Sequence, residues 1–193
     1  MHEQQHRLKK FNHQQLPEII QALELPDAVS VLIADAKTDI EIIDSLINAG
    51  YDEFATKLLA MGLPHREVIW WAYLCCQESE KNNKDQVTQE ALQVIDSWVK
   101  QPTDFQRRIA GKLAEQLEYY SPSSWIAAAV FWSGGSITPE EKPQVEPAMY
   151  MCNTAASNAI LFSAEISDDS SSFMKQALRR GLHIAMGGNG KIE

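Results

Sequence analysis

Apolar residues along most of this chain recur at every third or fourth position, which is the spacing of one face of an α-helix. The pattern predicts helices over residues 38–50, 51–62, 86–101, about 103–120, 122–132 and about 147–164, one around 65–77, and a last helix capped by 167–172. The most regular stripe lies in 103–120, and we expect its members to share a buried face: Phe105, Ile109, Leu113, Leu117 and Tyr120.

Capping residues mark several of these helix ends. Thr38 and Glu41 have the spacing of a capping box, in which the threonine hydroxyl accepts from the Glu41 amide and the glutamate reaches back. Gly50 and Gly62 stand where a left-handed residue commonly ends a helix, so we expect both glycines to adopt that conformation.

The stretch HREVIWWAYLCCQ (65–77) is the most hydrophobic of the predicted helices. Every residue from Val68 to Cys76 is apolar, so this helix has no polar face. A helix that is hydrophobic all round belongs inside a protein, covered on both sides. We therefore place it at the centre of the fold.

These elements predict an all-α fold, a single irregular multi-helix bundle or stack of about 7–9 helices with little or no sheet. VSVLIA (29–34) is compatible with a strand or with a short buried helix. Residues 136–147 contain three prolines and predict the one clear loop. We expect residues 1–15 to form a polar mobile arm and residues 16–193 to form a single helical domain.

The chain of 193 residues carries a formal net charge of −9. This charge argues against binding to nucleic acid or to an anionic membrane, because both need a cationic face. The apolar runs at residues 68–76 and 126–132 are both far shorter than a membrane span, and residues 1–15 lack the pattern of a signal peptide. We expect a cytoplasmic protein without membrane insertion.

Three cysteines, Cys75, Cys76 and Cys152, are the first candidates for chemistry. Structural zinc sites use ligand pairs spaced by two to four residues, and neighbours on a helix point in different directions, so Cys75 and Cys76 do not fit a metal site. We expect reduced, small, buried side chains, with no metal and no cofactor. A catalytic dyad of Cys75 or Cys152 with His183 is an alternative that the sequence leaves open, because the two residues of such a pair are neighbours in space rather than in sequence.

Two further patterns invite a functional interpretation. GGNGK (187–191) has the residue types of a phosphate loop but neither its spacing nor a following helix, so we expect a frayed tail. Acidic residues gather between 39 and 53, and they predict a solvated face or a docking face for a basic partner: Asp39, Glu41, Asp44, Asp52 and Glu53.

All five tryptophans lie within residues 70–132, and core packing explains most of them. Trp70 stands near the start of its helix beside Arg66 and Glu67, whereas Trp132 stands at a helix end. Tryptophan is a frequent anchor of protein–protein contacts. We therefore expect a protein-binding surface made of Arg66, Glu67, Trp70 and Trp132.

Four blocks carry a family resemblance, in this order along the chain: LPHREVIWWAYLCC (63–76), SWVKQPTDFQRR (97–108), WIAAAVFWSGGSITP (125–139) and GLHIAMG (181–187). They resemble a family of uncharacterised bacterial proteins, a domain of unknown function associated with type VI secretion gene clusters. The resemblance covers residues 63–187. It implies a genomic setting rather than an activity, and it assigns no catalytic residue.

Three functional hypotheses follow. The first is a non-enzymatic helical protein that binds another protein, a secretion component or an effector, as adaptor, chaperone or regulator of a type VI-like secretion system. The second is an immunity protein that neutralises a secreted effector, a role that suits a small acidic helical protein. The third is a thiol-dependent enzyme.

Overall fold

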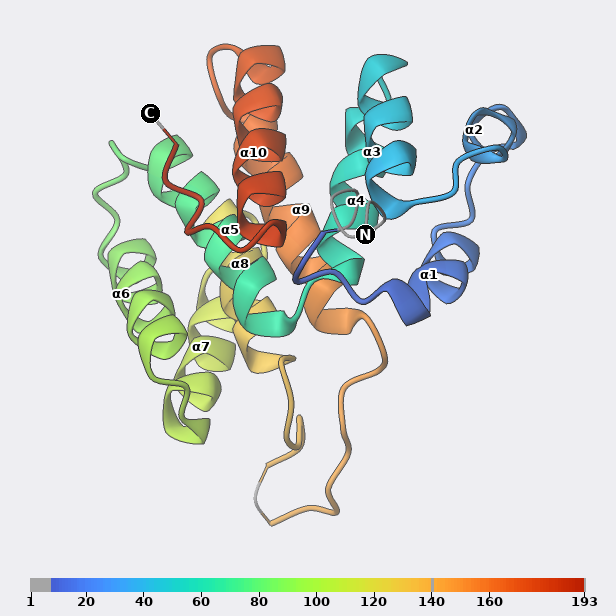
Figure 1. Ribbon diagram of the computed structural model, residues 1–193. Helices are drawn as coiled ribbons and strands as arrows, with labels where there is room; N and C mark the ends of the chain where they lie inside the picture. The colour runs from blue at the N-terminus through green and yellow to red at the C-terminus, as the bar shows by residue number, and fades with distance from the viewer. Residues whose placement is uncertain (1–7, 140, 193) are drawn as a thin grey trace.

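The computed structural model describes residues 8–139 and 141–192, and every regular element within these ranges is helical, as predicted (Figure 1). The elements are η2 (His13–Gln15), α1 (Leu16–Ala22), α2 (Asp27–Ile33), α3 (Asp39–Asn48), α4 (Asp52–Gly62), α5 (His65–Ser79), α6 (Gln86–Lys100), α7 (Asp104–Gln116), α8 (Pro122–Phe131), α9 (Met151–Glu165) and α10 (Ser170–Ala185). None of the described helices is both long and apolar enough to span a membrane.

The described ranges contain ten α-helices, more than the expected 7–9. The difference arises at the N-terminal side, where α1 and α2 are each seven residues long, too short to show a clear apolar period. Residues 29–33 of the strand-like stretch belong to α2 and Ala34 is its C-cap, so the helical interpretation is confirmed. Val31 is nevertheless 75% exposed, and α2 is therefore only partly buried.

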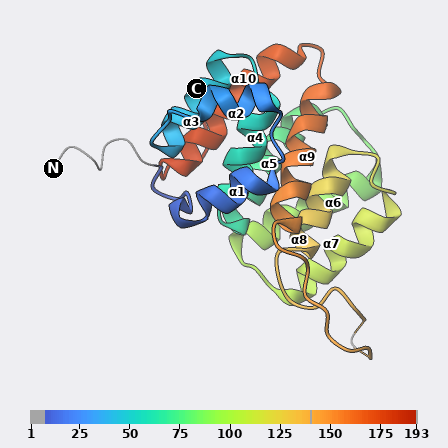
Figure 2. The same ribbon diagram turned by 90° about the vertical axis from the view of Figure 1, so that its right-hand side faces the viewer.

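Helix α5 lies at the centre of the fold, as its all-apolar sequence predicts. It packs against α6, α8, α9 and α10, which surround it in Figures 1 and 2. Trp71 is fully buried, and its indole N–H donates to the carbonyl of Ala177 in α10 (2.7 Å). A Cβ atom at Gly181 would lie 2.6 Å from the Trp71 ring, so glycine allows this close approach of α10 to α5.

The capping signals are confirmed at α3 and wrong at Gly62. Thr38 accepts from the Glu41 amide (3.2 Å), the Glu41 side chain reaches back, and Gly50 is left-handed with φ of 80°. Gly62 is the last residue of α4 and has no positive φ. Its role is steric, because the ring of Phe11 fills the space that a Cβ atom would occupy.

Residues 8–15, which we call the N-terminal strap, lie against the helices instead of forming a mobile arm. Leu8 and Phe11 are buried, and these two apolar side chains in an otherwise polar stretch explain the difference. The Leu8 amide donates to the carboxylate of Asp39 (3.1 Å), which is 1% exposed and so does not belong to a solvated acidic face. Residues 1–7 of the predicted arm lie outside the described ranges.

Helix α7 buries only part of the predicted face, since Leu113 is buried and Ile109 and Leu117 are partly buried against the core. Phe105 and Tyr120 are 75% and 79% exposed, and the helix ends at Gln116. The ring of Phe131 in α8 lies 2.8 Å from the place that a Cβ atom of Gly111 would take. Helix α7 therefore turns small residues toward α8, and part of its large apolar stripe faces outward.

The glycine-rich C-terminal segment lies against α5 and is not a frayed tail. The amides of Gly187 and Gly188 donate to carbonyls in the last turn of α10, the pair of bonds that defines a Schellman motif. Gly187 supplies the left-handed residue, with φ of 100°. The indole N–H of Trp70 then donates to the Asn189 carbonyl (2.7 Å) and ties this segment to α5.

Candidate functional site

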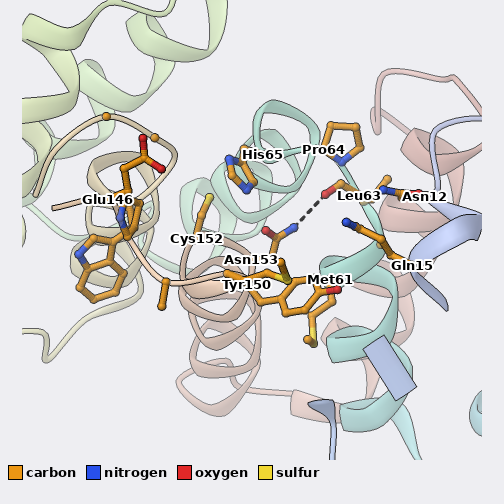
Figure 3. Close-up of a pocket in the computed structure, with 17 residues that line it drawn as sticks. Asn12, Gln15, Met61, Leu63, Pro64, His65, Glu146, Tyr150, Cys152 and Asn153 are labelled. Carbon is orange, nitrogen blue, oxygen red and sulfur yellow. Dashed lines mark hydrogen bonds between the residues drawn. The ribbon is translucent and has the colours of Figure 1, made fainter. Parts of the chain in front are cut away.

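A cavity of about 750 Å³ lies between the start of α5 and the start of α9, and we call it the α5–α9 cavity. Its lining comes from the N-terminal strap, the α4–α5 turn, the segment after α8 and the segment before α9 (Figure 3). This volume is within the usual range of ligand sites in proteins. Trp132, one of the four residues of the predicted surface, lines it.

The connection between α8 and α9 forms one wall of the cavity, and α7 holds this connection in place. Arg107 is buried and donates to the carbonyls of Phe131 (2.8 Å) and Ser136 (3.0 Å). Its Nε atom donates to Asp104 (2.7 Å), and the hydrogen bonds and charges of Arg107 and Arg108 lower the pKa of Asp104. The predicted loop over 136–147 is confirmed for residues 136–139 and 141–147, and this connection projects from the helices (Figures 1 and 2).

Two side chains fix the start of α5 against the cavity walls. Asn153 is buried in α9, and its amide nitrogen donates to the carbonyls of Ala60 (2.7 Å) and Leu63 (2.8 Å). The Nδ1 atom of His65 lies 2.7 Å from the carbonyl oxygen of Ser133. Because a carbonyl only accepts, Nδ1 carries the proton, and in the neutral ring Nε2 is left as a hydrogen-bond acceptor.

Tyr150 precedes α9 in a conformation that is uncommon for a bulky residue. Its φ of 64° and ψ of 0° place it in the left-handed region. Its hydroxyl oxygen is buried and has no hydrogen-bond partner among the described residues. Burial, and after it the nearby Glu18 carboxylate, raises the pKa of this phenol. Strained residues of this kind are common at functional sites.

The rim of the cavity carries exposed apolar side chains and one carboxylate. Met149 is 75% exposed and Val145 is 48% exposed, both on the connection before α9. Glu146 lies between them in sequence and lines the cavity. The rim can therefore offer both an apolar contact and a negative charge.

The three thiols are free and buried, as predicted. Burial raises the pKa of Cys75 to about 12, and it raises the pKa values of Cys76 and Cys152 as well. Cys152 lines the same cavity as His65, but no hydrogen bond joins a thiol to a histidine among the described residues. The thiols are therefore protonated at neutral pH. No group of three or more histidine, cysteine or acidic residues in the described ranges is arranged to hold a metal ion.

The structure brings three residues of the predicted surface together and places the fourth elsewhere. Arg66, Glu67 and Trp70 line a groove of about 390 Å³ on another side of the α5 start, whereas Trp132 lines the α5–α9 cavity. Each of the three has a partner within the chain. Arg66 donates to the carbonyl of Val99 (2.6 Å) at the end of α6, Glu67 pairs with Lys10 of the strap (3.2 Å), and Trp70 is bonded to the C-terminal segment.

Several cavity residues were missed by sequence reasoning. The contact of His65 with Ser133 spans 68 positions, so no local spacing in the sequence indicates it. Asn153 and Tyr150 follow the proline-containing loop without any recognisable motif. One signal was available for Asn153, since an amide inside an Ala- and Ser-rich helix needs a buried hydrogen-bond partner.

Comparison with known families finds one match. Residues 42–185 match a family described as a family of unknown function (DUF6931). The match begins earlier than the resemblance at 63–187, because it includes most of α3 and all of α4. No curated protein and no solved structure matches the chain.

Proposed function

This chain belongs to the DUF6931 family, and we propose that it is a non-enzymatic protein that binds another protein through the α5–α9 cavity. Its role is that of an adaptor, chaperone or regulator of a bacterial type VI-like secretion system, in the cytoplasm. The secretion setting rests on the sequence resemblance of residues 63–187. The choice of surface rests on the geometry of the cavity.

One observation carries the proposal. Two blocks of the resemblance, 63–76 and 125–139, lie far apart in the sequence but line the same cavity. The first contributes residues 63–65, and the second contributes residues within 132–135. Beside this cavity, Met149 is 75% exposed although it is large and apolar. Burying such a side chain against a partner contributes about 25 cal/mol for each Å² removed from water. Methionine also adapts its shape to different partners.

A co-purification experiment tests the proposal. The tagged full-length protein is isolated from a producing strain, in parallel with Met149→Asp and with Ile166→Asp. Ile166 is a matched control, since it is 46% exposed and follows the opposite end of α9. We expect a secretion component or an effector with the wild-type and Ile166→Asp proteins, and much less of it with Met149→Asp. Equal recovery with all three proteins would reject the cavity as the binding surface.

The net charge of −9 favours a second candidate, an immunity protein that blocks a cationic effector. Deleting the gene decides between the two roles. An immunity protein leaves the deletion strain open to killing by its siblings, and complementation restores protection. If the protein is an adaptor or chaperone, the deletion strain stays immune but its secretion is impaired.

A further inference from the structure

The charge of the α5–α9 cavity indicates what kind of segment it accepts. Among the residues that the structure describes, Glu146 lines the cavity and no lysine or arginine does. Glu18 of α1 lies close enough to Tyr150 to contribute to the raised pKa of its phenol. The groove on the other side of the α5 start differs, because three basic residues, Lys10, Arg66 and Lys100, line it together with a single carboxylate, that of Glu67. A basic ligand therefore meets its complement in the cavity and not in that groove.

The polar groups of the cavity favour a peptide main chain over a compact charged ligand. The side-chain amides of Asn12 and Gln15 from the strap line it, and such groups both donate and accept hydrogen bonds as peptide groups do. The Nδ1 atom of His65 is occupied by Ser133, which leaves Nε2 to accept from an N–H group. The backbone of Gly134 and Gly135 also lines the cavity, without side chains to block an approaching chain.

The exposed side chains at the rim of the cavity favour a ligand that carries a large apolar group. Met149 and Val145 are exposed on the anchored connection before α9, and the indole of Trp132 is partly exposed inside the cavity. An aliphatic or aromatic side chain placed beside Met149 would cover these surfaces. Glu146 lies next to them in the chain, so a positive charge near that side chain would be paired.

We propose that the α5–α9 cavity binds an extended segment of the partner protein in which a large apolar residue is flanked by lysine or arginine. This inference rests on the proposed function and specifies its partner. The apolar side chain contacts Met149 and Trp132, the basic side chain pairs with Glu146, and the segment's main chain bonds to the amides of the strap.

Selection from a displayed library of random dodecapeptides tests the proposal on the full-length chain. The bait is the wild-type protein, and the enriched peptides are then measured against Glu146→Lys and Met149→Asp. The matched controls are Glu165→Lys and Ile166→Asp, which make the same charge changes at the opposite end of α9, about 22 Å away along a 15-residue helix. All four altered residues are exposed, so the variants are expected to fold, and circular dichroism verifies this.

We expect enrichment of peptides with lysine or arginine beside a large apolar residue. Their affinity should fall about tenfold or more with Glu146→Lys and with Met149→Asp, and should stay unchanged with both controls. Enriched peptides without basic residues, peptides that bind Glu146→Lys as tightly as wild type, or no enrichment at all would overturn the inference. The proposed function is tested separately by co-purification. If a partner depends on Met149 for its recovery but its bound segment is not basic, the proposed function holds and this inference fails.

Discussion

The ring of Phe11 lies directly on Gly62, in the space that a Cβ atom at position 62 would occupy. This contact joins the N-terminal strap to the end of α4, and the Asn12 amide adds a hydrogen bond to the Gly62 carbonyl (2.8 Å). The strap borders the α5–α9 cavity through Asn12 and Gln15. The packing of the Phe11 ring against Gly62 therefore helps to form one wall of the candidate site.

Gly62→Ala tests this contact. The added methyl group overlaps the Phe11 ring, so we expect a loss of about 1–3 kcal/mol in the free energy of unfolding, measured with urea. In a Phe11→Ala background the methyl group has room, and the same substitution should cost much less. An equal cost in both backgrounds would show that the ring does not lie on Gly62.

Arg107→Met tests the anchoring of the connection between α8 and α9. The substitution leaves the carbonyls of Phe131 and Ser136 without their charged donor, so we expect a destabilisation of about 3 kcal/mol and faster proteolysis within residues 136–147. The exposed Arg179→Met is the control and should change neither measurement. If the proteolysis rate of the loop stays at the wild-type value in Arg107→Met, Arg107 does not hold this segment.

Glu80 gives a prediction for pH. It is 5% exposed at the end of α5, where it accepts from the amide of Ser123 (2.9 Å) at the start of α8. Burial raises the pKa of Glu80 above its usual 4.5, so the folded state binds a proton more tightly than the unfolded state does. The stability contributed by this proton is complete below pH 4.5 and is lost as the pH rises through the folded-state pKa.

Glu80→Gln removes this titration. Urea unfolding at a series of pH values between about 4 and 8 should therefore show the variant gaining stability relative to wild type as the pH rises, with a plateau above the folded-state pKa. A difference between variant and wild type that stays constant with pH, or that shrinks as the pH rises, contradicts the assignment.

The thiols give a prediction for reactivity. Because burial raises the pKa values of Cys75, Cys76 and Cys152, the thiolate form is scarce in the folded protein at about pH 8. We expect iodoacetamide to modify none of them in the folded chain and all three after unfolding in urea, as counted by mass spectrometry. Rapid alkylation of Cys152 without denaturant would contradict this prediction and would support the hypothesis of a thiol-dependent enzyme.

Local signals predicted much of this fold. The capping box at Thr38, the start of a helix at residue 122 and the all-apolar stretch of α5 depend on neighbours in the sequence, and the structure agrees with each. The stripe of α7 shows where such reasoning stops. Periodicity identified an apolar face containing Phe105, but Gly111 and Arg107 decide which face meets α8 and its following loop.

The candidate site was less predictable, because its contacts join distant segments. Asn153 bonds to carbonyls 90 and 93 positions away, and His65 to one 68 positions away. The helix positions of Arg66 and Trp70 alone predict surface residues that are available to a partner. Their hydrogen bonds to Val99 and Asn189 emerge only from the packing of α6 and the C-terminal segment against α5.

Site-specific photo-crosslinking shows directly whether the α5–α9 cavity contacts a partner protein. A photoreactive residue replaces Met149 in one strain and Ile166 in another, and crosslinked species are identified by mass spectrometry after irradiation of producing cells. We expect a discrete heteromeric product with a secretion component or effector from position 149 and none from position 166. The absence of any product at position 149, or the same products from both positions, would contradict it.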